Sequence, residues 1–314
     1  MNMFTRLQPL SGTVVLELQS DGIAVVSISR ARQPQVQFTR FFALAKTDAP
    51  TLLKRIHKEL KLKHSECIHL LGVNDYQLSA VDAPNVPQEE MKSAVRWLLK
   101  DMLDYNSDDA TIDVIDIPTR DYTVGRKPMV YAISAHNTLI AERQHWFEEA
   151  QIPLEIIDIP DLAQRNIANL IAPDDRGIAV FSLHAAGSIL TVSFKGELYL
   201  ARHFDISLLQ LIHATADQKI AIFDKLALEL QRSFDHIDRQ YPFVDLIKLV
   251  LPAPTAIIHE LISHLTNNLY IPVEALDLSS IFDISLAPDL QQTDTQARFQ
   301  LCLGAALRHE DKTL

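Results

Sequence analysis

The sequence predicts an α/β protein made of two copies of one domain, and a near-repeat is the main observation behind this prediction. Residues 152–159 read Ile-Pro-Leu-Glu-Ile-Ile-Asp-Ile, and residues 271–278 read Ile-Pro-Val-Glu-Ala-Leu-Asp-Leu. Each octapeptide follows an apolar strand, a short turn and one helix, and these apolar strands lie at residues 129–133 and 246–251. Because the two copies are too far apart for a solenoid repeat, they indicate one β-α-β unit in each half of the chain.

The beginning of each half supports the duplication. Residues 13–28 alternate apolar and polar side chains on both sides of a turn at Gly22, and residues 178–194 do so around Gly187. This alternation is typical of a β-hairpin. Third strands are expected at residues 35–45 and 197–202. Each half therefore opens with an antiparallel meander and closes with β-α-β, which divides the chain into domains 1–170 and 171–314.

The first half is longer than the second. From Val14 to Ile152 is 138 residues, whereas from Ile178 to Ile271 is 93, an excess of 45. An excess of this size predicts an inserted subdomain, which we place at about residues 76–126. The alternative is that this segment is simply more of the first domain.

The insert should contain a strand at residues 76–81, a helix, and a strand at residues 111–117. Pro87 in the first turn favours a helix, and an apolar stripe follows it with helical spacing. The stripe consists of Met91, Val95, Leu98, Leu99 and Met102. Two further stripes predict helices of the second half, made of Phe223, Leu226, Leu230, Phe234, Ile237 and Tyr241, and of Ile257, Ile258, Leu261, Ile262 and Leu265.

Composition and charge restrict the class of protein. No apolar run approaches 18 residues, so no membrane span is expected, and the amino terminus has no apolar stretch typical of a secretion signal. The net charge of −11, without a basic stripe, argues against nucleic-acid binding. Cys67 and Cys302 lie in apolar patterns and are expected to be buried, reduced thiols. These features favour the cytoplasm, and the residues after Arg308 are expected to form a polar tail.

Two duplicated halves that each open with a hairpin match the layout of the actin-like (ribonuclease H-like) fold, in which a nucleotide lies between the halves. Backbone N–H groups must approach the phosphates closely, so this chemistry needs glycines in both opening turns and after a later strand. This chain has only 8 glycines and lacks all three motifs. The positions where they are missing include Glu17, Ser20, Ser182, His184, Pro252 and Ala253. We therefore expect a pseudo-ATPase without a cofactor.

Two observations leave an ATPase open as an alternative. Glu17 could replace the aspartate that holds Mg²⁺, and Gly22 and Gly187 lie a few residues downstream of the missing motifs, where hairpin turns explain them better. We find no other catalytic pattern and expect no metal site. His259 and His264, for example, are five residues apart on a helix and point in different directions.

Several strings in the sequence resemble the PilM family of type IV pilus assembly proteins. They are residues 85–90, 94–97, 228–235 and 302–308, and the resemblance covers most of the chain in order. Together with the missing glycines, they are most similar to the MshI-type branch that serves the mannose-sensitive haemagglutinin (MSHA) pilus. The resemblance implies an actin-like fold with an inserted subdomain in a cytoplasmic protein peripheral to the inner membrane.

The resemblance also implies a partner. Members of this family bind the short amino-terminal tail of a PilN-like (here MshJ-type) inner-membrane protein, in a groove between the insert and the main domain, and so link the platform to the pilus motor ATPases. An apolar groove between a helix-covered insert and its domain suits a short peptide. The matching positions would be Leu78, Val95, Leu98, Leu99 and Ile115.

This chain also departs from the family, because PilM proteins keep a nucleotide pocket and carry a subdomain in the second half for which there is little room here. We therefore expect a non-catalytic adaptor. The alternatives are an active actin-like ATPase and a polymerising protein like the division protein FtsA.

Overall fold

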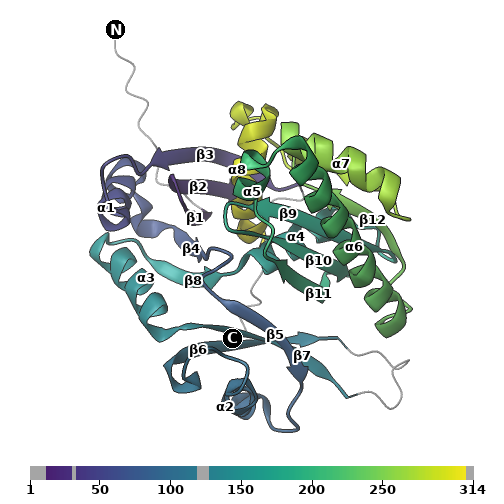
Figure 1. The fold of residues 1–314 in the computed structure, drawn as a ribbon. Coiled ribbons are helices and arrows are strands. Elements are labelled where there is room, and N and C mark those ends of the chain that lie inside the picture. The colour runs from purple at the N-terminus through teal and green to yellow at the C-terminus, as the bar shows by residue number, and fades with distance from the viewer. Residues whose placement is uncertain (1–11, 30–32, 119–126, 309–314) are drawn as a thin grey trace.

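The structure, a computed structural model, describes residues 12–29, 33–118 and 127–308. The end of the expected insert at residue 126, the amino-terminal segment and the expected polar tail after Arg308 lie outside these ranges. Two five-stranded sheets lie on either side of a pair of central helices, and a smaller three-stranded sheet projects from one end (Figure 1).

The first sheet has the strand order β3-β2-β1-β4-β8. Its meander consists of β1 (Thr13–Gln19), β2 (Gly22–Ser29) and β3 (Gln35–Ala43). The other two strands are parallel to β1: β4 (Glu66–Leu70) pairs with β1, and β8 (Leu154–Asp158) pairs with β4. The hairpin expected at residues 13–28 is therefore confirmed, with Gly22 as the first residue of β2.

The second sheet repeats this arrangement with the order β11-β10-β9-β12-β13. Its strands are β9 (Gly177–His184), β10 (Gly187–Phe194), β11 (Glu197–Phe204), β12 (Leu246–Leu251) and β13 (Val273–Ala275). The two near-identical octapeptides contain β8 and β13, which form equivalent edges of the two sheets. The duplication read from the sequence is thus present in the strand pairings.

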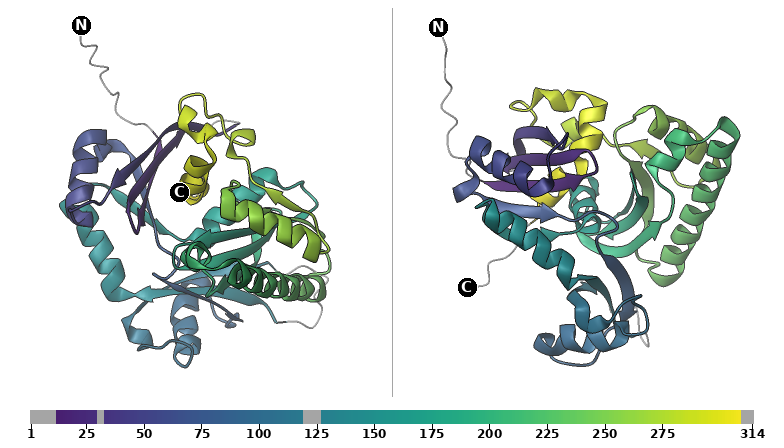
Figure 2. Two further views of the ribbon diagram at one scale, coloured as in Figure 1. Left: turned by 45° about the horizontal axis from the view of Figure 1, so that its top comes forward. Right: turned by 60° about the vertical axis from the view of Figure 1, so that its left-hand side comes forward.

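Helices cover both outer faces and fill the space between the sheets (Figure 2). The outer face of the first sheet packs against α1 (Ala49–Leu60) and α3 (Asn137–Glu149). The outer face of the second packs against α6 (Ala216–Gln240) and α7 (Ala256–Asn268), with α5 (Leu208–His213) before them. The central pair is α4 (Pro160–Ile171) and α8 (Thr293–Ala306). Single-turn 3-10 helices are η1 (Leu62–His64), η2 (Ser107–Asp109), η3 (Leu278–Ser280) and η4 (Pro288–Gln291).

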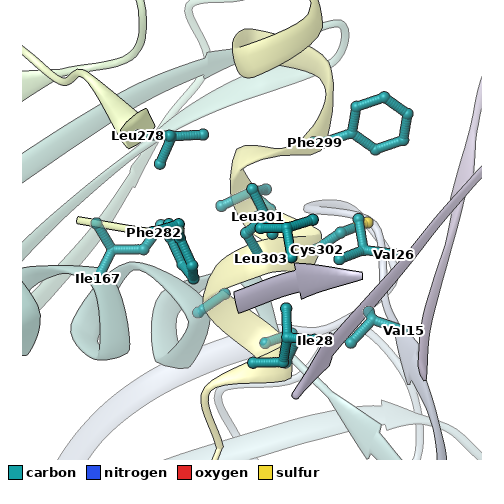
Figure 3. Packing of buried hydrophobic residues seen from close by; sticks show 14 of the residues in the cluster. Val15, Val26, Ile28, Ile167, Leu278, Phe282, Phe299, Leu301, Cys302 and Leu303 are labelled. Atoms are coloured by element: carbon teal, nitrogen blue, oxygen red, sulfur yellow. The ribbon is translucent and has the colours of Figure 1, made fainter. Parts of the chain in front are cut away.

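The central helices interlock the two halves. The closing helix of the first half, α4, packs on the second sheet, whereas α8, which closes the second half, packs on the first sheet. Figure 3 shows Phe299, Cys302 and Leu303 of α8 among side chains of β1 and β2. Gly304 lets the two helices touch, because a Cβ at this position would lie 2.3 Å from the carbonyl oxygen of Ala163. One continuous core therefore joins both halves.

The insert is built from β5 (Gln77–Asp82), α2 (Gln88–Leu99), β6 (Ala110–Ile117) and β7 (Met129–His136). The strand order β5-β7-β6 corrects one expectation, since residues 129–133 do not open a β-α-β unit of the main domain. They form the central strand of the insert sheet, which therefore continues past residue 126. An apolar run shows that a strand is buried, but it does not show which sheet contains it.

The strand equivalent to β12 is β4, which lies before the insert. The excess of 45 residues underestimates the insert, because the second half has α5 and the long α6 where the first half has α1 and the single-turn η1 between its third and fourth strands. Two unequal insertions thus partly offset each other in the length comparison.

Other sequence-level expectations concern single residues and helices. Cys67 and Cys302 are free and buried, as expected. None of the helices in the described part of the chain is both long and apolar enough to cross a bilayer. Within the same residues, no group of three or more His, Cys, Asp or Glu side chains is placed to hold a metal ion.

Candidate functional site: a cleft between the insert and the first sheet

A cleft of about 760 Å³ separates the insert from the first half. One wall is the face of the insert sheet, where Ile115 and Ile133 project from β6 and β7. A second wall is α3, whose Ile140, Gln144 and Glu148 follow one another at helical spacing. The third wall is β8, at the edge of the first sheet. The cleft therefore has the volume of a ligand site, with apolar side chains from all three walls that could contact an extended peptide.

The contribution of β8 is unusual, because every residue from Leu154 to Ile159 lines the cleft. Successive side chains of a strand point to opposite faces of its sheet. A cavity that touches all five residues of β8, and Ile159 beyond it, therefore lies along the edge of the strand. In the described residues, β4 is the strand that pairs with β8, so the opposite edge of β8 faces the cleft.

Charged groups are placed at the margins of the cleft. Carboxylates come from three elements, at Asp113, Glu148 and Glu155. The Asp113 carboxylate lies 2.8 Å from the Lys92 ammonium, which compensates its charge. Glu148 and Glu155 are exposed. Exposed carboxylates therefore lie at the margin of the cleft.

One charged pair lies inside the cleft. Arg308, just beyond α8, lies 3.0 Å from Oδ1 of Asp158, whose side chain is fully buried. The same Oδ1 accepts a hydrogen bond from the N–H of Ile159 at 2.8 Å. The other oxygen, Oδ2, is buried and accepts no hydrogen bond from the described residues. Burial raises the pKa of Asp158 above its ordinary value, although the charge of Arg308 opposes this shift.

The residues expected to form the groove do not all meet there. Val95 and Leu99 are buried under α2 in the core of the insert, and Leu98 is 45% exposed on the outer side of the helix. Leu78 and Ile115 lie on the opposite face of the insert sheet, and of the five only Ile115 lines the cleft. Val95 and Leu99 do not line this cleft, because they cover the insert's own sheet.

The first opening hairpin is occupied by contacts with α8. Glu17 accepts hydrogen bonds from Gln19 Nε2 at 3.0 Å and from Cys302 Sγ at 3.2 Å. Burial raises the pKa of Glu17, while these hydrogen bonds and the charge of Arg298 oppose the shift. Arg298 also donates to Gln19 Oε1 at 3.0 Å, and Ser20 is exposed at the turn. The side chains at this hairpin thus contact one another and α8.

The second opening hairpin contains a buried polar network. Ser182 Oγ and His184 Nε2 are 2.7 Å apart, and Gln164 of α4 donates to the same hydroxyl. Burial lowers the pKa of His184 to about 4, so this imidazole is neutral at physiological pH. Nearby, Asp161 of α4 accepts a hydrogen bond from the Tyr76 hydroxyl, and its Oδ1 lies 3.0 Å from His203 Nε2. These bonds tie α4 to the second sheet and to the start of the insert.

The third of the expected glycine motifs would follow β12. Pro252 and Ala253 are both buried before the first turn of α7. Proline lacks a backbone N–H and each of the two residues carries a Cβ, so this loop lacks features that close phosphate or adenosine contact requires. Among the six residues at the places of the missing glycine motifs, Ser182 and His184 contact each other. Glu17 contacts α8.

Comparisons with known proteins identify the fold. The chain matches no protein-family model and no curated protein sequence. Among solved structures, it aligns with a PilM–PilN type IV pilus biogenesis complex at a TM-score of 0.73 and 18% identity, over 96% of this chain and 99% of the other. It also aligns with a Bacteroides thetaiotaomicron protein of actin-like ATPase fold and unknown function, at a TM-score of 0.52 and 11% identity, over 90% and 96% of the two chains. The chain has the actin-like ATPase fold.

The actin-like assignment confirms the fold class expected from the duplicated meanders and β-α-β segments. It also directs attention to two regions that differ in character. The region between the opening hairpins is the place where this fold can hold a nucleotide, and here its side chains bond to one another. The cleft beside β8 is open and combines apolar side chains with charged ones, so it is the stronger candidate for a functional site.

Proposed function

We propose that this protein is a non-catalytic adaptor of a type IV pilus assembly platform that binds the cytoplasmic tail of a PilN-like inner-membrane protein. The observation that carries the proposal is the apolar cleft between the insert and β8, in a chain whose fold follows that of PilM in a PilM–PilN complex along almost its whole length. An extended tail fits such a cleft by contributing apolar side chains and backbone hydrogen bonds.

The finer assignment rests on the sequence strings at residues 85–90, 228–235 and 302–308. Their resemblance favours the MshI-type branch of MSHA pilus biogenesis, with an MshJ-type partner. In this assignment the adaptor is cytoplasmic and peripheral to the inner membrane, and it connects the platform to a motor ATPase.

The adaptor is proposed to be a pseudo-ATPase for two reasons. Side chains of both opening hairpins form hydrogen bonds within the protein, and Pro252-Ala253 stands where a glycine pair is expected. We expect millimolar ATP with Mg²⁺ to leave the thermal unfolding midpoint unchanged. A ligand present at 100 times its dissociation constant would add about 2.7 kcal/mol to the free energy of unfolding. A rise of several degrees that requires Mg²⁺ would favour the active ATPase instead.

The adaptor role predicts that a charge placed in the cleft prevents partner binding. Ile140→Arg puts a cation on the α3 wall, and we expect it to weaken binding of a peptide copying the partner's cytoplasmic tail by tenfold or more, measured by fluorescence anisotropy. The reason is that the guanidinium would have to be desolvated by an apolar ligand.

The matched control is Ile220→Arg on α6, where the isoleucine is 54% exposed and lies outside the cleft residues. This variant should bind the peptide like the parent. Equal affinities of all three proteins would place the peptide elsewhere, and no binding by the parent would contradict the adaptor role itself.

A further inference from the structure

We propose that the partner segment binds as an added β-strand along the free edge of β8, with one of its hydrogen-bond donors meeting Oδ2 of Asp158. This inference rests on the proposed function and names the chemistry of recognition at that site. The expected occupant is an extended segment that combines apolar residues with cationic ones.

The backbone of β8 is oriented for strand addition. The carbonyl of Asp158 accepts a hydrogen bond from Leu71 N–H at 2.9 Å, so the backbone groups of Asp158 face β4. In a strand, the N–H and C=O groups of adjacent residues point in opposite directions. Those of Ile157 therefore point away from β4, toward the cleft that Ile157 lines. An incoming strand would pair with these groups and extend the sheet to six strands.

Asp158 supplies a specific acceptor at the end of this edge. Arg308 and the Ile159 N–H contact its Oδ1, which leaves Oδ2 as a buried acceptor without a donor among the described residues. An unsatisfied acceptor in a buried carboxylate is costly, and a donor from a bound segment would relieve this cost. Asp158 itself lines the cleft, so a bound segment would lie beside this carboxylate.

The charges around the cleft indicate the chemistry of the segment. Arg308 and Lys92 are each placed beside a carboxylate, whereas Glu148 and Glu155 are exposed at the margin. The whole chain carries a net charge of −11. The short cytoplasmic segments of inner-membrane proteins are enriched in Lys and Arg. An apolar segment with Lys or Arg at its ends would therefore fit both the interior and the margin of the cleft.

Strand addition makes a distinctive prediction for peptides methylated at single backbone nitrogens. Because alternate residues of an added strand direct their N–H groups toward β8, methylation should weaken binding at every second position. We expect a loss of about fivefold or more at these positions, the effect of one lost hydrogen bond, and little change between them. The probe is the cytoplasmic segment that precedes the membrane span of the PilN-like protein, synthesised with one N-methyl group at a time and titrated against the full chain.

A substitution tests the carboxylate separately. Asp158→Asn removes the charge at nearly constant size, and we expect roughly tenfold weaker binding of the unmethylated peptide, because hydrogen bonds to charged groups are the stronger ones. Asp82→Asn is the matched control, since this carboxylate is likewise paired, with Lys127, but lies outside the cleft lining, and it should change affinity little. Unfolding midpoints of both variants show whether either substitution has disturbed the fold.

The possible outcomes separate this inference from the proposed function. Alternating losses together with weaker binding by Asp158→Asn would support strand addition to β8. Binding that is insensitive to N-methylation, or reduced uniformly, would overturn strand addition while leaving the adaptor role in place. Failure of the unmodified peptide to bind would overturn the adaptor role and, with it, this binding mode.

Discussion

Replacing Gly304 with alanine should lower the unfolding temperature of this protein, although glycine-to-alanine changes within helices usually stabilise. An ordinary helical site gains up to about 1 kcal/mol from this change. Here the added methyl group would lie 2.3 Å from the Ala163 carbonyl oxygen and 3.1 Å from Ile167 Cδ1. A backbone carbonyl cannot move aside as a side chain can, so α4 and α8 would have to separate. We expect a net loss of about 3 kcal/mol, typical of overpacking.

The measurement is thermal or urea unfolding of parent and variant, with Gly72→Ala as the control. A Cβ at Gly72 would first meet Oδ2 of Asp75 at 3.3 Å, which is a side-chain atom rather than a backbone carbonyl. This control should therefore cost much less than the change at Gly304. Equal stabilities of parent and Gly304→Ala would show that the two central helices do not cross as closely as described.

Acid should weaken the fold through His69, the second large effect that we expect. This side chain is 2% exposed, and its Nδ1 donates to the Leu16 carbonyl at 3.1 Å. Its Nε2 is buried and has no hydrogen-bond partner among the described residues. Burial lowers the pKa of His69 to about 4, and the nearby positive charge of Arg143 contributes to this shift. The folded protein therefore holds this histidine neutral.

The direction of the pH effect follows from proton binding. An unfolded histidine titrates near pH 6.5, so between pH 6.5 and 4 the unfolded chain binds more protons than the folded one. Above pH 6.5, His69 should cause no change of the free energy of unfolding with pH. This free energy should fall as the pH drops toward 4, with a loss of about 3 kcal/mol once the folded pKa is reached.

Urea unfolding at several pH values tests this effect with two variants. His69→Gln keeps a neutral donor for Leu16 and should make the fall between pH 6.5 and 4 smaller by about 3 kcal/mol. The remaining fall includes the contribution of His184, whose pKa burial also lowers to about 4. His259→Gln changes an exposed histidine on α7 and should follow the parent. Parallel curves for the parent and His69→Gln would mean that other groups cause the acid sensitivity.

The opening strands and the duplicated design could be read from the sequence because they depend on local patterns. Alternating side chains around Gly22 and Gly187 mark the hairpins wherever the rest of the chain lies. The matching octapeptides mark β8 and β13 for the same reason. By contrast, residues 129–133 show the apolar run of a buried strand, and only the pairing of β7 with β5 and β6 reveals the sheet to which it belongs.

The cleft was harder to predict because no single element contains it. It receives Ile115 from β6, Ile140 from α3 and a strand edge from β8, and none of these has a local pattern that distinguishes binding from packing. Asp158 appears in the sequence as an ordinary acidic residue at the end of a strand. Its burial and its pairing with Arg308 depend on a residue just past the end of α8, 150 residues further along the chain.

The way in which α4 and α8 cross has a consequence for the origin of the molecule. Each half contributes its closing helix to the other half's sheet, which is the reciprocal exchange seen in domain-swapped dimers. A single ancestral copy would have exposed the inner face of its sheet unless two identical chains exchanged this helix. The present chain is equivalent to such a pair joined end to end. In such an arrangement one half can carry an insert beside its sheet while the core shared by α4 and α8 stays closed.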